Sequence, residues 1–179
     1  MNNIDVVPLV EQLVALAKTD QTKPKPDNLR ADWETDLLFG RMDRLFCYER
    51  SDPAGYAEFG RQVLGEVGDF PEVAALARLA IFRGERLLPP SEEQRQTLLE
   101  MVSSLKKAIK VLPEGTRKAR CSSLFQYHSG VFYDAYGCFA EAADAQLHAT
   151  RVAKRGGDLA GAAISSFLAT LYTLKGALV

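Results

Sequence analysis

Cysteine, histidine and tryptophan are scarce in this chain of 179 residues, which has three, two and one of them respectively. Cys47, Cys121 and Cys138 are odd in number and far apart, and no C-x-x-C pair occurs. Neither a disulfide framework nor a structural zinc site is therefore indicated. We interpret the three cysteines as free thiols in a reducing compartment.

The sequence also lacks an excess of charge and a long apolar run. Lys plus Arg number 22 and Asp plus Glu number 23, so the net charge of −1 provides no global attraction to nucleic acid or to an anionic membrane. No apolar run approaches the ~20 residues that a membrane span needs. The first five residues lack the basic start of a secretory signal. We expect a cytoplasmic protein with no membrane partner.

No set of acid, base and nucleophile can be assembled from the sequence. His128 and His148 lack the H-x-x-x-H or E-x-x-H context of metal ligands, so we expect histidines of a surface or groove. Cys121 and His128 would lie about 10 Å apart along one helix, too far for a hydrogen bond. Residues 155–158, R-G-G-D, indicate a helix end followed by an aspartate cap rather than a phosphate loop. We therefore predict no enzymatic activity, no cofactor and no metal.

One segment, residues 101–120, is locally basic, with six basic residues and one acidic residue. Such a segment could meet RNA, DNA or an acidic peptide. No aromatic residue is interleaved with it, so we interpret it as a solvated loop and helix end and expect no nucleic-acid partner. The basic residues are Lys106, Lys107, Lys110, Arg117, Lys118 and Arg120, and the acidic one is Glu114.

Apolar residues recur with the helical period of 3.6 along the chain, and alternating apolar–polar runs are absent, which predicts an all-α fold. Residues 1–18 are expected to form an N-terminal helix or arm, and the proline-containing residues 19–29 a linker. Residues 30–179 are expected to form one helical domain. The helices are expected over 31–48, 53–67, 71–86, 91–112, 116–136, 138–154 and 158–175. Capping residues support two starts, Ser51 or Asp52 before Pro53, and Ser91 before two glutamates.

The most informative pattern is G-x-x-Y-x-x-x-G-x-F-x-x-A-x-x-x-x-x-x-A. Small residues belong where two helices approach closely, and aromatic residues fill the gaps where the helices diverge. A glycine at the third marked position suits a chain reversal. The pattern thus describes two short helices folded against each other. Its six residues are Gly130, Tyr133, Gly137, Phe139, Ala142 and Ala149.

This pattern resembles the tetratricopeptide repeat family. The resemblance implies antiparallel helix pairs stacked as a right-handed solenoid. Three positions depart from the family: Gln126 replaces a bulky aromatic residue, Gln146 a large residue of the second helix, and Lys154 the closing proline.

A partial second copy follows 39 residues later, against a usual family period of 34, so that clear resemblance covers residues 122–179. The copy consists of Ala169, Tyr172, Gly176 and Leu178. Fainter echoes lie upstream, at Tyr48, Asp52, Ala54 and Ala57, and at Ala77, Ala80 and Gly84.

In this family the first helix of each pair forms a concave surface that reads peptides. Carried over by position, the predicted partner-binding groove consists of Tyr127, His128, Val131, Asp134, Ser166, Thr170 and Thr173. It lacks the lysine and arginine pairs with which some members clamp a terminal carboxylate, which disfavours that ligand.

The sequence stops where the second helix of the last repeat should begin, which would leave apolar residues of helix 158–175 uncovered. We expect either that the protein continues beyond residue 179 or that a second copy covers this face in a homodimer. The predicted self-association face consists of Phe167, Leu168, Leu171 and Leu174.

Two functions are compatible with these observations. The first is a protein–protein interaction scaffold that binds a partner peptide or helix, or associates with itself, through the repeats. The alternative is a regulatory domain of a larger bacterial signalling or transcription protein that senses a ligand or peptide, as longer-repeat relatives of the family imply.

Overall fold

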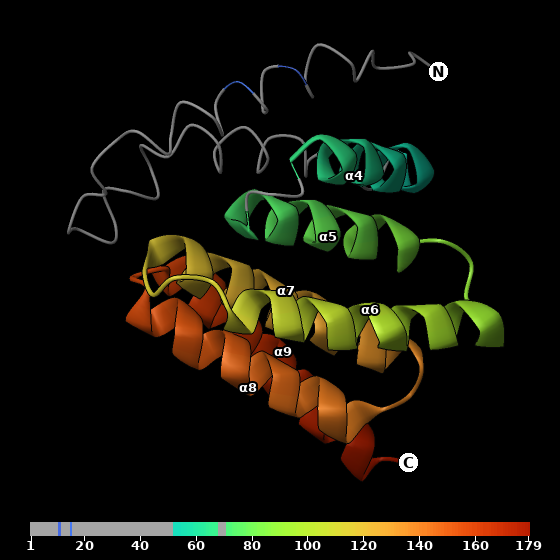
Figure 1. Ribbon diagram of the computed structural model, residues 1–179. Coiled ribbons are helices and arrows are strands. Elements are labelled where there is room, and N and C mark those ends of the chain that lie inside the picture. The colour runs from blue at the N-terminus through green and yellow to red at the C-terminus, as the bar shows by residue number, and fades with distance from the viewer. Residues whose placement is uncertain (1–10, 12–14, 16–51, 68–70) are drawn as a thin grey trace. The chain divides into compact units, whose positions relative to one another are not determined.

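The structure is a computed structural model that describes Glu11, Ala15 and residues 52–67 and 71–179 (Figure 1). The expected arm over 1–18, the linker over 19–29 and the helix over 31–48 lie essentially outside the described residues. The regular elements in the described part are α-helices, with no strand, which confirms the all-α prediction there. They are α4 (Pro53–Val67), α5 (Pro71–Glu85), α6 (Glu92–Lys110), α7 (Thr116–Ala135), α8 (Phe139–Arg155) and α9 (Leu159–Ala177).

Side-chain caps start several of these helices where the sequence predicts them. Asp52 accepts a hydrogen bond from the Gly55 amide at 2.9 Å ahead of α4. Ser91 accepts one from the Gln94 amide at 3.1 Å ahead of α6. Each cap satisfies an amide that has no partner within the first turn of the helix, which explains why these starts are encoded locally.

The chain divides into two compact units, residues 1–101 and 102–179, with the boundary inside α6. In the first unit α4 and α5 pack antiparallel through two glycines. A Cβ on Gly60 would lie 2.9 Å from the Ala77 carbonyl oxygen. A Cβ on Gly84 would lie 2.5 Å from the Pro53 carbonyl oxygen and 2.8 Å from the Ala57 Cβ. The two backbones therefore meet at positions where only glycine fits.

In the second unit two turns of the same kind join α7 to α8 and α8 to α9. Gly137 and Gly157 have positive φ values of 73° and 77°. The Cys138 amide donates to the Tyr133 carbonyl, and the Asp158 amide donates to the Ala153 carbonyl, both at 2.9 Å. These are the bonds of the Schellman motif, which ends a helix at a left-handed glycine. The predicted chain reversal at Gly137 is confirmed, and so is the predicted cap, since Asp158 accepts from the Gly161 amide at 2.8 Å.

Helix α8, drawn in orange in Figure 1, packs against both α7 and α9. Two ion pairs connect α7 with α9. Arg120 and Asp158 join the starts of the two helices at 2.6 Å, and Asp134 and Lys175 join their ends at 2.6 Å. Because both pairs join like ends, α7 and α9 run parallel to each other.

The small residues of the pattern lie at helix contacts. Ala142 and Ala149 are fully buried in α8. A Cβ on Gly130 of α7 would lie 2.6 Å from the Gln146 side chain of α8. A cluster of Ala142, Ala143 and Tyr172 packs with Tyr133, Leu168 and Leu171 and so joins α8 to both α7 and α9.

Candidate partner-binding surface

The predicted groove residues of α7 do not all reach the surface. Tyr127, Val131 and Asp134 are half-buried, whereas His128 is only 2% exposed. The His128 ring packs edge-on against the Tyr127 ring, with centroids 4.9 Å apart. The expectation that this histidine lies on a surface or in a groove is therefore corrected. Tyr127, Val131 and Asp134 share one helical face, and residue 128 is turned about 100° away from residue 127.

The predicted groove residues of α9 are exposed. Ser166, Thr170 and Thr173 follow each other at intervals of four and three residues on one face of the helix. The Thr170 hydroxyl donates to the Ser166 carbonyl at 3.1 Å, and the Thr173 hydroxyl donates to the Ala169 carbonyl at 2.9 Å. The hydroxyl protons are thus used within the helix, and the oxygen lone pairs remain able to accept bonds.

Asp134 forms an ion pair with a residue that was not among the predicted site residues. Lys175 donates to its carboxylate at 2.6 Å, and the Lys175 ammonium lies 5.4 Å from the Tyr172 ring centroid and 5.8 Å from that of Phe139. Because Asp134 is paired, this position provides a neutral ion pair rather than an isolated acid. The two residues are 41 positions apart, and only the parallel run of α7 and α9 brings them together.

Gln146 is the main residue that sequence reasoning misjudged, because it counted only as a departure from the family pattern. It is fully buried, and its side-chain amide donates to the Tyr127 carbonyl at 2.9 Å. It occupies the space that Gly130 leaves open on α7. Gly130 has no side chain, which indicates that another helix approaches closely at that position. This is the signal that could have indicated a buried partner such as Gln146.

Part of the basic segment is used for structure. Lys118 bonds the Glu114 carboxylate at 2.6 Å and the Lys110 carbonyl at 3.1 Å, and Arg120 pairs with Asp158. These contacts connect the loop after α6 with the starts of α7 and α9. The segment does include a loop and helix ends, but the Lys118 and Arg120 side chains are only 21% and 20% exposed, so the expectation of a solvated segment does not hold for these two residues.

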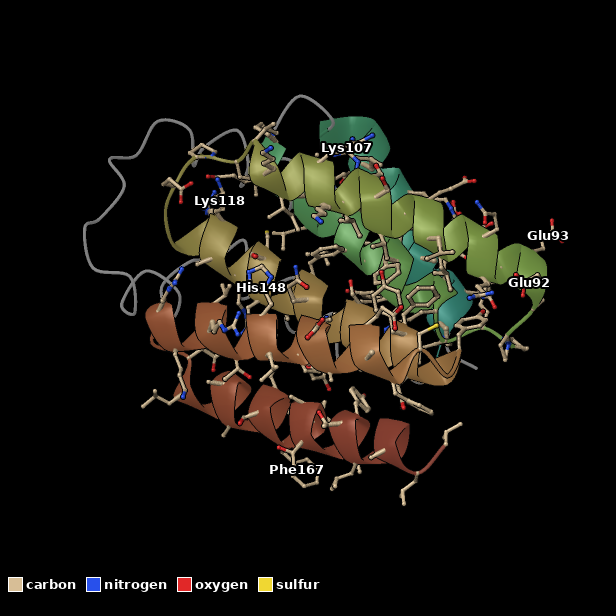
Figure 2. The ribbon with its side chains drawn as sticks, turned by 90° about the horizontal axis from the view of Figure 1, so that it is seen from below. Glu92, Glu93, Lys107, Lys118, His148 and Phe167 are labelled. Atoms are coloured by element: carbon tan, nitrogen blue, oxygen red, sulfur yellow. The ribbon has the colours of Figure 1, made fainter. Side chains whose placement is uncertain are left out.

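His148 lies on the exposed side of α8 among cations, and Figure 2 labels its position. Burial lowers the pKa of His148 below its ordinary value of 6.5, and the charges of Arg151, Arg155 and Lys106 lower it further. The neutral imidazole is favoured there because a proton would add a fourth positive charge. Among the described residues, no group of three or more histidine, cysteine or acidic side chains is placed to hold a metal ion.

The predicted self-association face is only partly open. Phe167 and Leu174 are 69% and 58% exposed, and Figure 2 shows Phe167 on the side of α9 that is turned away from α8. Leu168 and Leu171 are half-buried and pack against the α8 cluster. Four further large apolar residues of α9 and its end are exposed but were not selected from the sequence: Leu159, Ile164, Leu178 and Val179.

Comparisons with known proteins add no assignment. A scan of protein-family models, a search of curated proteins and a search of solved structures each gave no significant match. None of the described helices is both long and apolar enough to cross a bilayer.

Proposed function

We propose that the chain is a protein-interaction module of the tetratricopeptide kind, in which a segment of a partner protein lies against α7 and α9. In this proposal α7 and α8 form one helix pair, α9 begins the next, and the pairs stack as a right-handed solenoid. The observation that carries the proposal is the parallel run of α7 and α9, joined at both ends by ion pairs. In a stack of such repeats the first helices of neighbouring pairs run parallel to each other, as α7 and α9 do.

The chemistry of the surface supports a partner segment rather than a reaction. Tyr127 and Val131 on α7 are half-buried, and the three hydroxyl residues on α9 are exposed. Lys175 is paired with Asp134, which disfavours its use as a cationic clamp for a terminal carboxylate. An uncharged internal segment of a partner, with apolar and hydrogen-bonding side chains, suits this composition.

A phage-displayed library of random peptides, selected on the full chain, tests the proposal. We expect enriched peptides whose affinity falls about tenfold, or ~1.4 kcal/mol, in Tyr127→Ala and in Thr170→Arg. Asp144→Arg, at an exposed site of α8, is the matched control and should keep the affinity. Asp134→Arg is a poor choice because it also breaks the ion pair with Lys175. Failure to enrich any peptide, or enriched peptides that bind both surface variants unchanged, would refute the proposal.

A further inference from the structure

Helix α9 carries a second apolar stripe on the side opposite its buried face. Ala162, Ser165, Ala169 and Tyr172 are the buried residues of this helix. Another six residues lie at intervals of four, three, four, three and four, the spacing of the a and d positions of a heptad repeat. At 100° per residue they fall within an arc of about 80°. We call them the α9 seam: Ala160, Ile164, Phe167, Leu171, Leu174 and Leu178.

The α9 seam is exposed at five of its six positions. Ile164, Phe167 and Leu174 are 54%, 69% and 58% exposed, and Leu178 is 87% exposed. Leu171, near the middle, is half-buried. A helix that is apolar on opposite faces is typically covered on both of them. The α9 seam thus lies mainly outside the contact with α8 and meets it at Leu171, which also packs against the cluster of Ala142, Ala143 and Tyr172.

The positions of the seam residues are spaced symmetrically about the level of Ala169. Residues 160 and 178, 164 and 174, and 167 and 171 are each equidistant from that level. A twofold axis perpendicular to α9 would place Phe167 opposite Leu171 of a second copy, and Ala160 opposite Leu178. The same patch then serves both copies, as an isologous interface requires. Small residues meet large ones at the two ends, which suits close packing.

The charge of α9 also favours a second copy. Lys175 is the single charged residue between Leu159 and Ala177, and it is paired with Asp134 of its own chain. In the antiparallel arrangement Lys175 and its symmetry mate would lie twelve residues apart along the interface, about 18 Å. This exceeds the screening length of about 8 Å at physiological ionic strength. Nothing along the seam repels a second copy, and nothing there attracts a charged partner.

The helix is already ordered before any association. Asp158 caps its start, and the Lys175–Asp134 ion pair holds its last turn to α7. Association therefore avoids the entropy loss of forming a helix.

We propose that a second copy of this chain docks on the α9 seam, with the two α9 helices antiparallel about a twofold axis at the level of Ala169. The proposal uses a different face of α9 from Ser166, Thr170 and Thr173, and it does not depend on peptide binding. Either proposal can therefore fail without the other.

Light scattering coupled to size-exclusion chromatography of the full chain tests for the dimer. We expect twice the chain mass of 19.7 kDa for the wild type and 19.7 kDa for Phe167→Glu. Ala177→Glu, at an exposed site of the same helix outside the seam, should remain dimeric. Far-UV circular dichroism of each variant shows whether its helix content is kept. A wild type that stays at the monomer mass up to about 100 μM, or a Phe167→Glu variant that stays dimeric, would overturn the proposal.

A mixing experiment tests the antiparallel register. Ile164→Lys and Leu174→Glu should each be monomeric alone, and an equimolar mixture should form a heterodimer visible by native mass spectrometry. The introduced charges face each other only if residue 164 lies opposite residue 174. A mixture of Ile164→Lys with Ile164→Glu is the matched control, and it should remain monomeric. Recovery of a dimer in the control mixture instead of the first would indicate a parallel pair and contradict the proposed axis.

Discussion

Replacing Gly130 by alanine should destabilise the protein, although alanine is the better helix former. The new Cβ would lie 2.6 Å from the Gln146 Nε2 atom and 3.0 Å from its Cγ and Cδ atoms. Gln146 is fully buried, so its side chain has no room to move aside without disturbing its neighbours. The contact is therefore repulsive even though Gln146 is a flexible residue.

The magnitude follows from three opposing contributions. Alanine in place of glycine stabilises a helix interior by about 1 kcal/mol. Displacing Gln146 breaks its hydrogen bond to the Tyr127 carbonyl and leaves a buried amide, which costs about 1–3 kcal/mol. Overpacking adds a further cost of about 1–3 kcal/mol. We expect the free energy of unfolding to fall by about 1–5 kcal/mol, with a central value of about 3 kcal/mol.

Urea unfolding followed by far-UV circular dichroism measures this change, with an unchanged m value if only stability is affected. Gly65→Ala is the matched control, because Gly65 is an exposed helix residue with no atom within 4 Å of a new Cβ. It should stabilise the protein by about 0.5–1 kcal/mol.

A double-mutant cycle isolates the contact itself. In the variant that combines Gly130→Ala with Gln146→Ala, the added methyl group takes the place of the removed amide. We expect the double variant to be at least about 1 kcal/mol more stable than the sum of the two single effects predicts. An additive cycle, or a Gly130→Ala variant as stable as Gly65→Ala, would show that this close approach does not exist.

Further predictions concern the other helix contacts and the lowered pKa of His148. Gly84→Ala should cost more than about 3 kcal/mol, because its new Cβ would meet backbone atoms that cannot rotate away, and thermal unfolding should show it; an unchanged midpoint would contradict the α4–α5 packing. Gly137→Ala should cost roughly 1–2 kcal/mol from its left-handed backbone at φ 73°, measured in the same way. Asp158→Ala should lower the free energy of unfolding by about 1–2 kcal/mol through loss of the helix cap, and it also removes the ion pair to α7. An asparagine at this position should retain the cap. NMR titration should find the pKa of His148 below 6.5, and the Lys106→Gln variant should have a higher His148 pKa than the wild type. As the pH falls below 6.5, the unfolded chain binds the proton before the folded chain does, so the free energy of unfolding should decrease. His148→Gln should reduce that decrease. A His148 pKa that does not respond to Lys106→Gln would place the two side chains apart.

Features that depend on a few neighbouring residues could be read from the sequence. The starts of α4, α6 and α9 follow from Asp52, Ser91 and Asp158, because a cap acts on amides three residues away. The reversal at Gly137 follows because glycine is the residue that adopts positive φ most readily. The helical period similarly predicts α-helices throughout the described part of the chain.

The candidate surface was predicted less well, because it depends on how the helices turn toward one another. His128 was placed on the surface with its neighbours, yet it is buried, and Asp134 is paired with Lys175 from a different helix. The stripe on α9 was recognised as apolar, but the structure shows which of its residues α8 covers and which remain open.

The sequence alone thus determined where the helices begin, end and reverse, since those features come from interactions within one or two turns. The tertiary structure decided that Gln146 fills the gap at Gly130, that α7 and α9 lie parallel, and that α9 exposes the seam. These outcomes depend on residues sixteen to forty-one positions apart. Their contacts are set by the relative rotation of packed helices, and neither capping nor periodicity specifies that rotation.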